Sequence, residues 1–225
     1  MASTPSTSNP GPARLPAATR GRRRRRRPRN VDATAETRID ILKSAAKAFR
    51  RLGYHGATVE AIAAALHMKK GNLYYYFKNK EEILFACHQY SLDHLTQLLD
   101  DVEQRASSPH DKLRALIVAS VHIILDELHG TALFLPLEAL STSHLTTIIA
   151  RRDRFDRGIR HLIDEGIAVG VFPPCEVKFI AFAILGAVNW IPRWFDPDGP
   201  ATSSDVADRF ADYLMAGLRV RNVCP

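Results

Sequence analysis

The sequence predicts an all-α fold, and three observations support this class. Apolar residues recur at the three- and four-residue spacing of amphipathic helices through most of the chain after Asn30. No segment alternates with period two for long enough to form a β-strand. Capping and breaking residues divide the periodic segments into separate helices. With 225 residues, the chain can bury a substantial core and hold one or two domains.

The segment Met1–Asn30 differs from the rest of the chain. It is rich in Ser, Thr, Pro, Ala and Arg, and it carries nine arginines without an acidic residue. We predict that it is disordered, because it cannot bury enough apolar surface to offset the entropy lost on ordering. The whole chain has 31 basic and 24 acidic residues and a net charge of +7. Without the nine arginines of this segment, 22 basic and 24 acidic residues remain, so the rest of the chain has a net charge of −2. Such concentration of positive charge is typical of a chain whose N-terminal part faces phosphates.

Three helices are predicted directly after this segment. The first covers about Glu36–Leu52 and ends at Gly53, and the second follows Thr58 as its N-cap. After a turn at His67 and Met68, the third covers about Lys70–Phe77. The apolar stripes of the first two helices contain Ile39, Leu42, Ala46, Phe49, Leu52, Ile62, Ala65 and Leu66.

Further helices are predicted in the C-terminal part. Asn79 with Glu82 resembles a capping box, and Ser108 followed by Pro109 is a second helix start. Pro136 interrupts a short apolar helix. The predicted ranges are Lys80–Arg105, Ser108–Gly130, Thr131–Leu140, Ser143–Ala168, Lys178–Phe195 and Ser204–Arg219, and the last of these has Val206, Phe210, Tyr213, Leu214 and Gly217 on one face.

The short second and third helices with the turn between them are typical of a helix-turn-helix that enters the major groove of DNA. Lys70 can donate to guanine, and Asn72 can pair with adenine in a bidentate manner. Tyrosine hydroxyls and a lysine ammonium can contact phosphates without reading sequence. The residues expected to contact DNA are Thr58, Lys69, Lys70, Asn72, Tyr74, Tyr75, Tyr76 and Lys80. The alternative is a packed tyrosine cluster with a solvated lysine face, but three adjacent helical tyrosines cannot all point inward.

This region resembles the tetracycline-repressor (TetR) family of bacterial transcriptional regulators. The resemblance rests on Ile41–Phe49, Gly53, Gly56–Thr58, Ile62–Ala63, Lys70–Gly71, Leu73–Tyr75, Phe77 and Lys80–Glu82. After the arginine-rich tail over residues 1–30, which composition predicts to be disordered, it implies a helix-turn-helix domain over 31–80 and a helical ligand-binding and dimerisation domain over 81–225. It also implies phosphate contacts at Thr58, Tyr74 and Lys80, with base or mixed contacts at Lys70, Asn72, Tyr75 and Tyr76.

Two positions depart from the usual family pattern. His67 stands where the family usually has Gly, and His is one of the few residue types enriched at positive φ. Lys69 stands where Ser or Thr often caps the recognition helix. Lysine cannot cap, so we expect a less firmly started helix that gains a positive charge near DNA.

The six arginines Arg22–Arg27 allow two interpretations. They can act as a nonspecific attachment to nucleic acid, or as an arm that enters the minor groove beside the recognition helix. The sequence leaves both open.

The C-terminal part is expected to form a homodimer that binds a small molecule. Ala181, Ala183, Gly186 and Ala187 permit close approach of a second helix, and the resemblance implies that this helix and the last one pair with their copies. The candidate lining of a ligand pocket is Val121, Leu125, Phe134, Leu137 and Trp190, for each of which ordinary core packing is the alternative. A weaker resemblance of Asn189–Leu218 to acyl-CoA-responsive regulators suggests an acyl-CoA or another apolar effector.

Two polar clusters are more simply explained as solvated helix faces. Arg151, Arg152, Arg154 and Arg157 suggest a phosphate site, but Asp153–Arg157 and Asp156–Arg160 have the spacing of salt bridges within a helix. His122, Asp126 and His129 have the spacing of metal ligands but lie opposite the apolar stripe of their helix. No metal and no cofactor are expected.

Other functional classes find little support. The sequence contains none of the GxSxG, HExxH, P-loop or GxGxxG motifs, so an enzyme is not expected. Cys87, Cys175 and Cys224 suggest reduced thiols of a cytoplasmic protein, and neither a signal peptide nor a membrane span is evident. We predict a ligand-responsive repressor that binds a palindromic operator in double-stranded DNA. The alternatives are a drug-efflux regulator that responds to lipophilic compounds and a ligand-independent DNA-binding protein.

Overall fold

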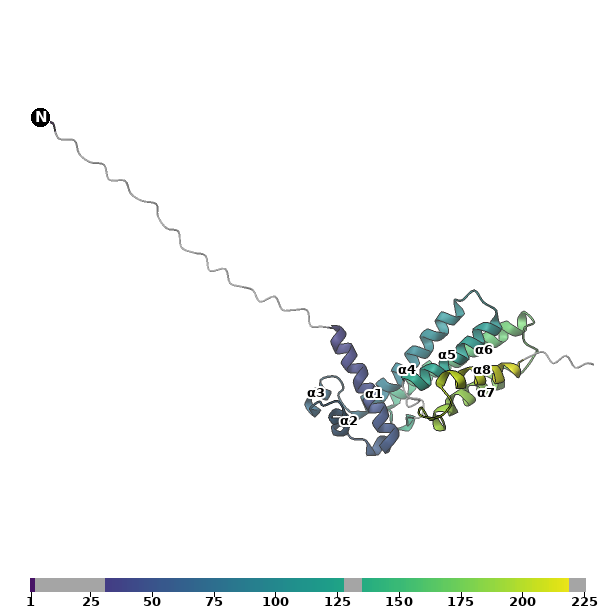
Figure 1. The fold of residues 1–225 in the computed structure, drawn as a ribbon, viewed down its shortest axis with the longest axis horizontal. Coiled ribbons are helices and arrows are strands. Elements are labelled where there is room, and N and C mark those ends of the chain that lie inside the picture. Colours follow the sequence, from purple (N-terminus) through teal and green to yellow (C-terminus); the bar gives the residue numbers. More distant parts are fainter. Residues whose placement is uncertain (3–30, 128–134, 219–225) are drawn as a thin grey trace, which may run out of the picture.

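The structure, a computed structural model, describes residues 1–2, 31–127 and 135–218. These residues form helices and no strand, as the periodicity predicts. The first three helices gather at one end of the molecule and the last four pack together at the other (Figure 1). The predictions for the arginine-rich tail and for Phe134 fall outside the described residues.

Helix α1 (Val31–Gly56) is longer than predicted at both ends. Gly53 within it has a φ of 70° and a ψ of 163°, so the regular helix stops where the sequence predicted its end. The apolar stripe is buried from Ile41 to Phe49. Leu52, which was predicted to belong to the stripe, is 44% exposed, because it lies at the end of the regular helix, next to the non-helical Gly53.

Helices α2 (Val59–Ala65) and α3 (Lys70–Tyr74) form the predicted helix-turn-helix. Thr58 is the N-cap of α2, since its side chain accepts a hydrogen bond from the Ala61 amide. His67 in the turn has a φ of 53°, as its residue type allows. The buried face of α2 consists of Val59, Ile62 and Ala63, with Leu66 partly buried beside it, whereas Ala65 is exposed because it lies two residues beyond Ala63 and points away.

The remaining helices begin largely at the predicted caps. Asn79 accepts from the Glu82 amide at the start of α4, and Ser108 accepts from the Asp111 amide at the start of α5. The elements are α4 (Lys80–Glu103), α5 (Pro109–His122), the π-helical turn η1 (Ile123–Glu127), the 3-10 turn η3 (Leu137–Ala139), α6 (Thr142–Ala168), α7 (Val177–Trp190), the 3-10 turn η4 (Ile191–Arg193) and α8 (Ser203–Ala216). Of the predicted face of α8, Tyr213 is 84% exposed, because Ala207 and Ala211 turn inward instead.

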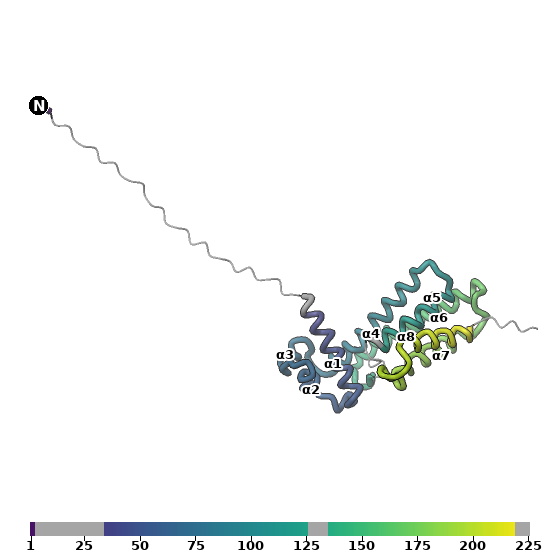
Figure 2. Tube along the Cα trace, viewed as in Figure 1, coloured from purple at the N-terminus to yellow at the C-terminus, as the bar shows by residue number. Residues whose placement is uncertain are grey.

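Two hydrophobic cores hold these helices together. The first lies around α1–α3 and includes Leu73 and Phe77, and the second lies among α4–α8. Helix α4 contributes Ile83 to the first core and Leu99 to the second, and α6 does the same with Ile148 and Phe155. Both helices therefore run from one core to the other, and the tube in Figure 2 follows α4 along this path.

None of the described helices has an apolar stretch long enough to cross a bilayer. Cys87 packs in the first core, where burial raises the pKa of its thiol to about 12 and its Sγ lies 3.6 Å from the Leu42 carbonyl oxygen. It therefore packs as a small apolar residue, as predicted.

Candidate DNA-binding surface and ligand cavity

Helix α3 presents most of its predicted DNA-contacting residues to solvent. Leu73 is fully buried and anchors the helix, and Phe77 directly after it is 1% exposed. Tyr74 and Tyr75 are 43% and 64% exposed, so the tyrosines do not form a closed packing cluster. Lys69, Lys70 and Asn72 are also exposed. The helix begins without a side-chain cap at Lys69, as the departure from the family pattern predicted.

Lys70 does not point freely into solvent. Its Nζ lies 2.5 Å from Oε1 of Glu60 on α2 and 5.6 Å from the centre of the Tyr74 ring. The carboxylate raises the pKa of Lys70, and the ammonium lowers the pKa of Glu60. Both side chains are about half exposed, so the pair is weak, and a base or phosphate can replace Glu60 as the partner.

Lys80 makes contacts within the protein that the sequence did not indicate. Its Nζ donates to the carbonyl oxygens of Tyr54 at 2.8 Å and Ala57 at 3.0 Å, with the His55 oxygen at 3.5 Å. It also lies 4.5 Å from the centre of the Tyr54 ring. Lys80 therefore stabilises the end of α1 in the absence of DNA. A phosphate would compete with these carbonyl oxygens for its three donors, and the phosphate contact stays a prediction.

Thr58 and Tyr76, two other residues predicted to contact DNA, also make contacts that stabilise the domain. Thr58 is exposed, its oxygen caps α2 by accepting from the Ala61 amide, and its hydroxyl donates to the Glu60 carboxylate. Tyr76 is partly buried against the first core, and its carbonyl oxygen accepts from Arg38 Nη1 at 3.0 Å. Tyr76 thus has less freedom to reach DNA than Tyr74 or Tyr75.

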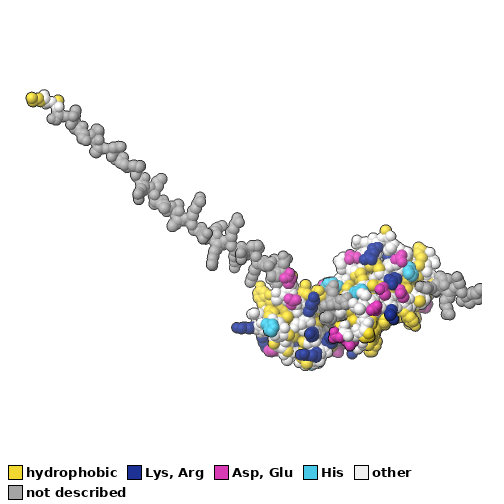
Figure 3. All heavy atoms as spheres, viewed as in Figure 1, with side chains coloured by type: hydrophobic (Ala, Val, Ile, Leu, Met, Phe, Trp, Pro, Cys, Tyr) yellow, Lys and Arg dark blue, Asp and Glu magenta, His cyan; other side chains and the backbone are white. Residues whose placement is uncertain are grey.

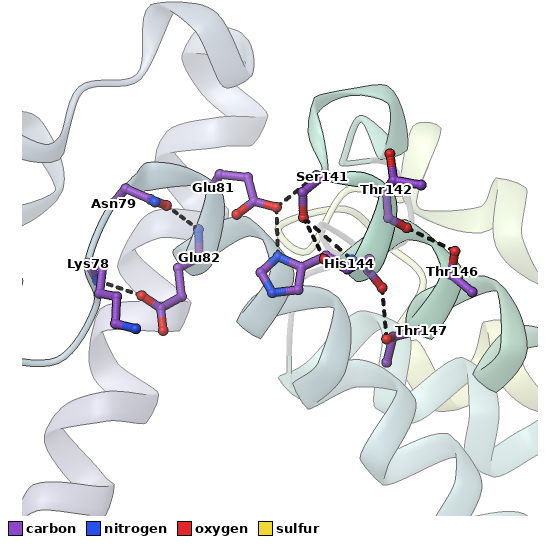
Figure 4. A network of polar contacts seen from close by, with 10 residues as sticks. Lys78, Asn79, Glu81, Glu82, Ser141, Thr142, His144, Thr146 and Thr147 are labelled. Carbon is purple, nitrogen blue, oxygen red and sulfur yellow. Dashed lines mark hydrogen bonds and ion pairs between the residues drawn. The ribbon is translucent and has the colours of Figure 1, made fainter.

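A polar contact joins the start of α4 to the start of α6. Glu81 Oε1 accepts from the Ser141 amide at 3.0 Å and lies 2.7 Å from His144 Nδ1 (Figure 4). The imidazole stacks on the Phe85 ring with a centroid distance of 3.8 Å. Burial would raise the pKa of Glu81, but the Ser141 amide and His144 lower it below its ordinary value. Ser141 also caps α6, so one carboxylate holds the beginning of that helix.

A cavity of about 490 Å³ lies between α4, α5, α6 and α7. Its volume is within the range of about 300–1,000 Å³ that small-molecule sites have. The apolar lining includes Leu92, Leu95, Leu113, Leu116, Ile117, Ile124, Phe155, Ile159, Phe182, Ile184, Leu185 and Val188. The polar lining consists of Ser120, Arg152, Asp153, Asp156, Arg160, Lys178 and Asn189.

Of the five residues predicted to line a ligand pocket, the four that the structure describes do not border this cavity. Val121 and Leu125 are buried in the second core but do not border the cavity. Leu137 packs against the first core, because η3 lies on the DNA-binding side of the molecule. Trp190 is 61% exposed, since it is on the outer face of α7. Phe134 falls in the segment that the structure does not describe. The four described residues therefore do not line this cavity, and a contact with a ligand stays a prediction for them.

Part of the polar lining, Arg152, Asp153, Asp156 and Arg160, comes from the segment of α6 that the sequence analysis interpreted as a solvated, salt-bridged face. Part of that interpretation is confirmed: Arg160 Nη2 lies 2.5 Å from Asp156 Oδ2, whereas the structure shows no such bridge between Asp153 and Arg157. Arg154 instead pairs across helices with Asp100 at 2.7 Å. Arg152 was missed as a cavity residue. Its i, i+3 and i+7 spacing with the apolar Phe155 and Ile159 was the signal that it faces inward.

The outer face of α7 is apolar and exposed. Phe179 and Trp190 are 67% and 61% exposed, and Phe182 between them is about half exposed. Gly186 has no atom within 4 Å of the place where a Cβ would be, so this part of the face is open. Ala181, predicted to admit a second helix, is fully buried in its own core. Figure 3 shows hydrophobic side chains along the edge that α7 occupies in Figure 1.

No group of three potential metal ligands occurs among the described residues. His122 belongs to α5, while the side chains of Asp126 and His129 lie outside the described part of the chain.

The second helix of the helix-turn-helix is exposed, cationic and aromatic, and a packed helical core supports it. These features are typical of a DNA-binding transcriptional regulator. The chain belongs to the TetR family. Residues 41–87 match the model for bacterial regulatory proteins of the tetR family, and residues 106–218 match the tetracyclin repressor-like C-terminal domain. Family members and relatives are transcriptional regulators and not enzymes, in agreement with the sequence prediction.

Individual relatives support this assignment over most of the chain. The chain is 27% identical over 188 residues to the transcriptional repressor KstR2 of Mycolicibacterium smegmatis, which covers 82% of this chain and 91% of that protein. It resembles the crystal structure of the TetR-family regulator PfmR of Thermus thermophilus with a TM-score of 0.72 and 32% identity, over 80% of this chain and 99% of that one. AibR, solved with isovaleryl coenzyme A and operator DNA, is similar with a TM-score of 0.68 and 28% identity, over 81% and 98% of the two chains.

Proposed function

We propose that this TetR-family regulator is a ligand-responsive repressor that binds a palindromic operator as a homodimer and is released by a small effector. The observation that carries the proposal is the combination of an exposed recognition helix with a separate, partly open cavity of about 490 Å³ among α4–α7. A ligand-independent DNA-binding protein has no need for such a cavity. The solved complex of AibR with both isovaleryl coenzyme A and operator DNA supports an apolar or acyl-CoA-type effector.

The recognition helix carries the specific contacts in this proposal. Asn72 pairs with a base edge, and Lys70 exchanges Glu60 for a guanine or a phosphate. Tyr74, Tyr75, Lys69 and Thr58 contact the backbone and fix the register. Because a carboxylate beside the DNA-facing lysine also repels phosphates, Glu60 lowers affinity for DNA of any sequence.

The exposed face of α7 supports the dimer. Phe179, Phe182 and Trp190 form a larger apolar surface than a monomer usually leaves in water. The open position at Gly186 lets the same helix of a second copy approach closely. A two-fold dimer then places two recognition helices about 34 Å apart, one turn of DNA, which requires an inverted repeat.

Helix α6 provides the connection between cavity and DNA. It carries Arg152, Phe155 and Arg160 at the cavity, and its first turn is bonded to Glu81 on α4. An effector that shifts α6 therefore moves the start of α4, which follows the recognition helix directly. Since two recognition helices must match successive major grooves, a small change of their separation weakens operator binding.

Selection of bound duplexes from a random pool tests the proposal. We expect an inverted repeat whose half-sites lie about one helical turn apart. A pool without an enriched inverted repeat would contradict it. A duplex with one half-site replaced serves as the control for dimeric binding, because it should bind the dimer much more weakly.

A further inference from the structure

Arg152 is a charged residue of the cavity lining for which no ion pair occurs among the described residues. Its Nε and Nη2 are buried and make no hydrogen bond. Burial lowers the pKa of its guanidinium, although an arginine remains charged at neutral pH. A buried donor without a partner is uncommon in folded proteins and calls for a physical explanation, of which a group bound from outside the chain is one.

Neighbouring acidic groups do not neutralise this guanidinium. Asp156 pairs with Arg160 through Oδ2, while its Oδ1 is buried and makes no hydrogen bond to Arg152 or to any other described residue. Arg154 pairs with Asp100 on α4. Arg151, the preceding residue, pairs with Asp93, which is also on α4. The three arginines around Arg152 thus each have a carboxylate, while Arg152 turns toward the cavity. His88, which faces Arg152 from α4, adds no negative charge and stays neutral because burial lowers its pKa to about 4.

The rest of the lining shows what kind of molecule fits beside Arg152. Arg160 Nε is also buried and without a partner, and Lys178 adds a third positive charge, against the two carboxylates Asp153 and Asp156. The opposite walls are aliphatic and aromatic. The cavity therefore joins a cationic patch to a larger apolar surface, and it disfavours a lipophilic cation.

We infer that the cavity binds an amphipathic organic anion whose carboxylate or phosphate pairs with the Arg152 guanidinium while its apolar body lies against α4, α5 and α7. The inference deepens the proposed function and rests on it for the link to DNA. An anionic group satisfies two buried donors at once, in the bidentate geometry that guanidinium favours. Binding also removes the cost of a buried charge that has no counter-ion.

Calorimetry on the full chain without DNA tests this inference with probes that share an alkyl chain: octanoate, octyl phosphate, octanoyl-CoA, octanol and octyltrimethylammonium. We expect octanoate or octyl phosphate to bind roughly tenfold to a hundredfold more tightly than octanol, as one charge-assisted hydrogen-bonded pair provides. Octyltrimethylammonium should bind more weakly than octanol. Binding by octanoyl-CoA together with octyl phosphate, but not octanoate, would identify phosphate as the anionic group.

Variants separate Arg152 from a general effect of charge. Arg152→Met should abolish the preference for anions over octanol, and its melting temperature without ligand should be equal or higher, because an unpartnered charge is removed. Arg154→Met on the same helix should keep the preference. Equal binding of octanol and the anions, an unchanged preference in Arg152→Met, or binding of none of the probes would overturn the inference. Each of these results leaves the selection of an operator unaffected, so failure of the ligand class is distinguishable from failure of the proposed function.

Discussion

The carboxylate of Glu81 on α4 bonds the first turn of α6 through His144 Nδ1 at 2.7 Å. Two helices that each span both cores are thereby joined at the end nearest the recognition helix.

If effector binding is transmitted through α6, the contact between Glu81 and His144 should be part of the path. We expect Glu81→Gln to bind the operator nearly as well as the native chain but to lose part of its release by effector, within the usual coupling range of about 1–3 kcal/mol. Anisotropy of a labelled operator, titrated with effector, measures both quantities.

The matched control for this prediction is Thr146→Ala. Thr146 is an exposed residue of the same helix, and its hydroxyl bonds only within α6, to the Thr142 carbonyl oxygen. It should leave release unchanged. Equal behaviour of both variants would exclude the Glu81 contact from the path.

Gly186 provides a test of the dimer face. Gly186→Leu places a bulky side chain on an open surface of the protomer and replaces a poor helix former, so the folded protomer should not lose stability. In a close helix pair the same side chain prevents approach. We expect the variant to sediment as a monomer and to bind the operator weakly, whereas Gly186→Ala should remain dimeric. A dimeric Gly186→Leu would place the interface elsewhere.

Gly158 tests the packing of α6 on α4. A Cβ at this position would overlap the end of the Leu99 side chain, so Gly158→Ala should lower the free energy of unfolding by about 1–3 kcal/mol. Gly186→Ala, at an open helical position, should instead raise it by up to about 1 kcal/mol. Urea denaturation compares the two variants, and a neutral effect at Gly158 would show that the helices separate easily.

His88 makes stability depend on pH. Burial and the charge of Arg152 lower its pKa from 6.5 to about 4 in the folded protein. Below pH 6.5 the unfolded chain takes up a proton that the folded protein resists, so stability falls as the pH decreases toward 4. We expect His88 to contribute a loss of about 2 kcal/mol between pH 7 and pH 5. Urea denaturation at both pH values should show a smaller loss for His88→Phe, and equal losses would contradict the shift.

The local features of the fold could be predicted from sequence, because caps depend on neighbouring residues. Thr58, Asn79 and Ser108 each start the helix that their type and spacing indicated. The exposure of Tyr74 and Tyr75 likewise agrees with the prediction that three adjacent helical tyrosines cannot all point inward. The exceptions were set by contacts distant in sequence. Lys80 bonds carbonyl oxygens more than twenty residues earlier, and no local pattern distinguishes that role from a phosphate contact.

The cavity and its lining were harder to predict for a related reason. Helix α7 is apolar nearly all round, so its sequence does not show which side faces the core, and Trp190 was placed inside although it lies outside. Arg152 was obscured by three neighbouring arginines that do form ion pairs. Arg152 differs from these arginines only in that it lies on the same helix face as Phe155 and Ile159. This spacing identifies it as a cavity residue only when α6 is known to border a cavity.

Asn72 offers the most direct test of the central claim that α3 reads DNA sequence. The dissociation constants of the native chain and of Asn72→Ala are measured on the selected operator and on a scrambled duplex, at one salt concentration. We expect the native chain to prefer the operator by at least about a thousandfold, and Asn72→Ala to lose about 1–3 kcal/mol on the operator alone. An equal loss on both duplexes, or no preference by the native chain, would contradict the claim.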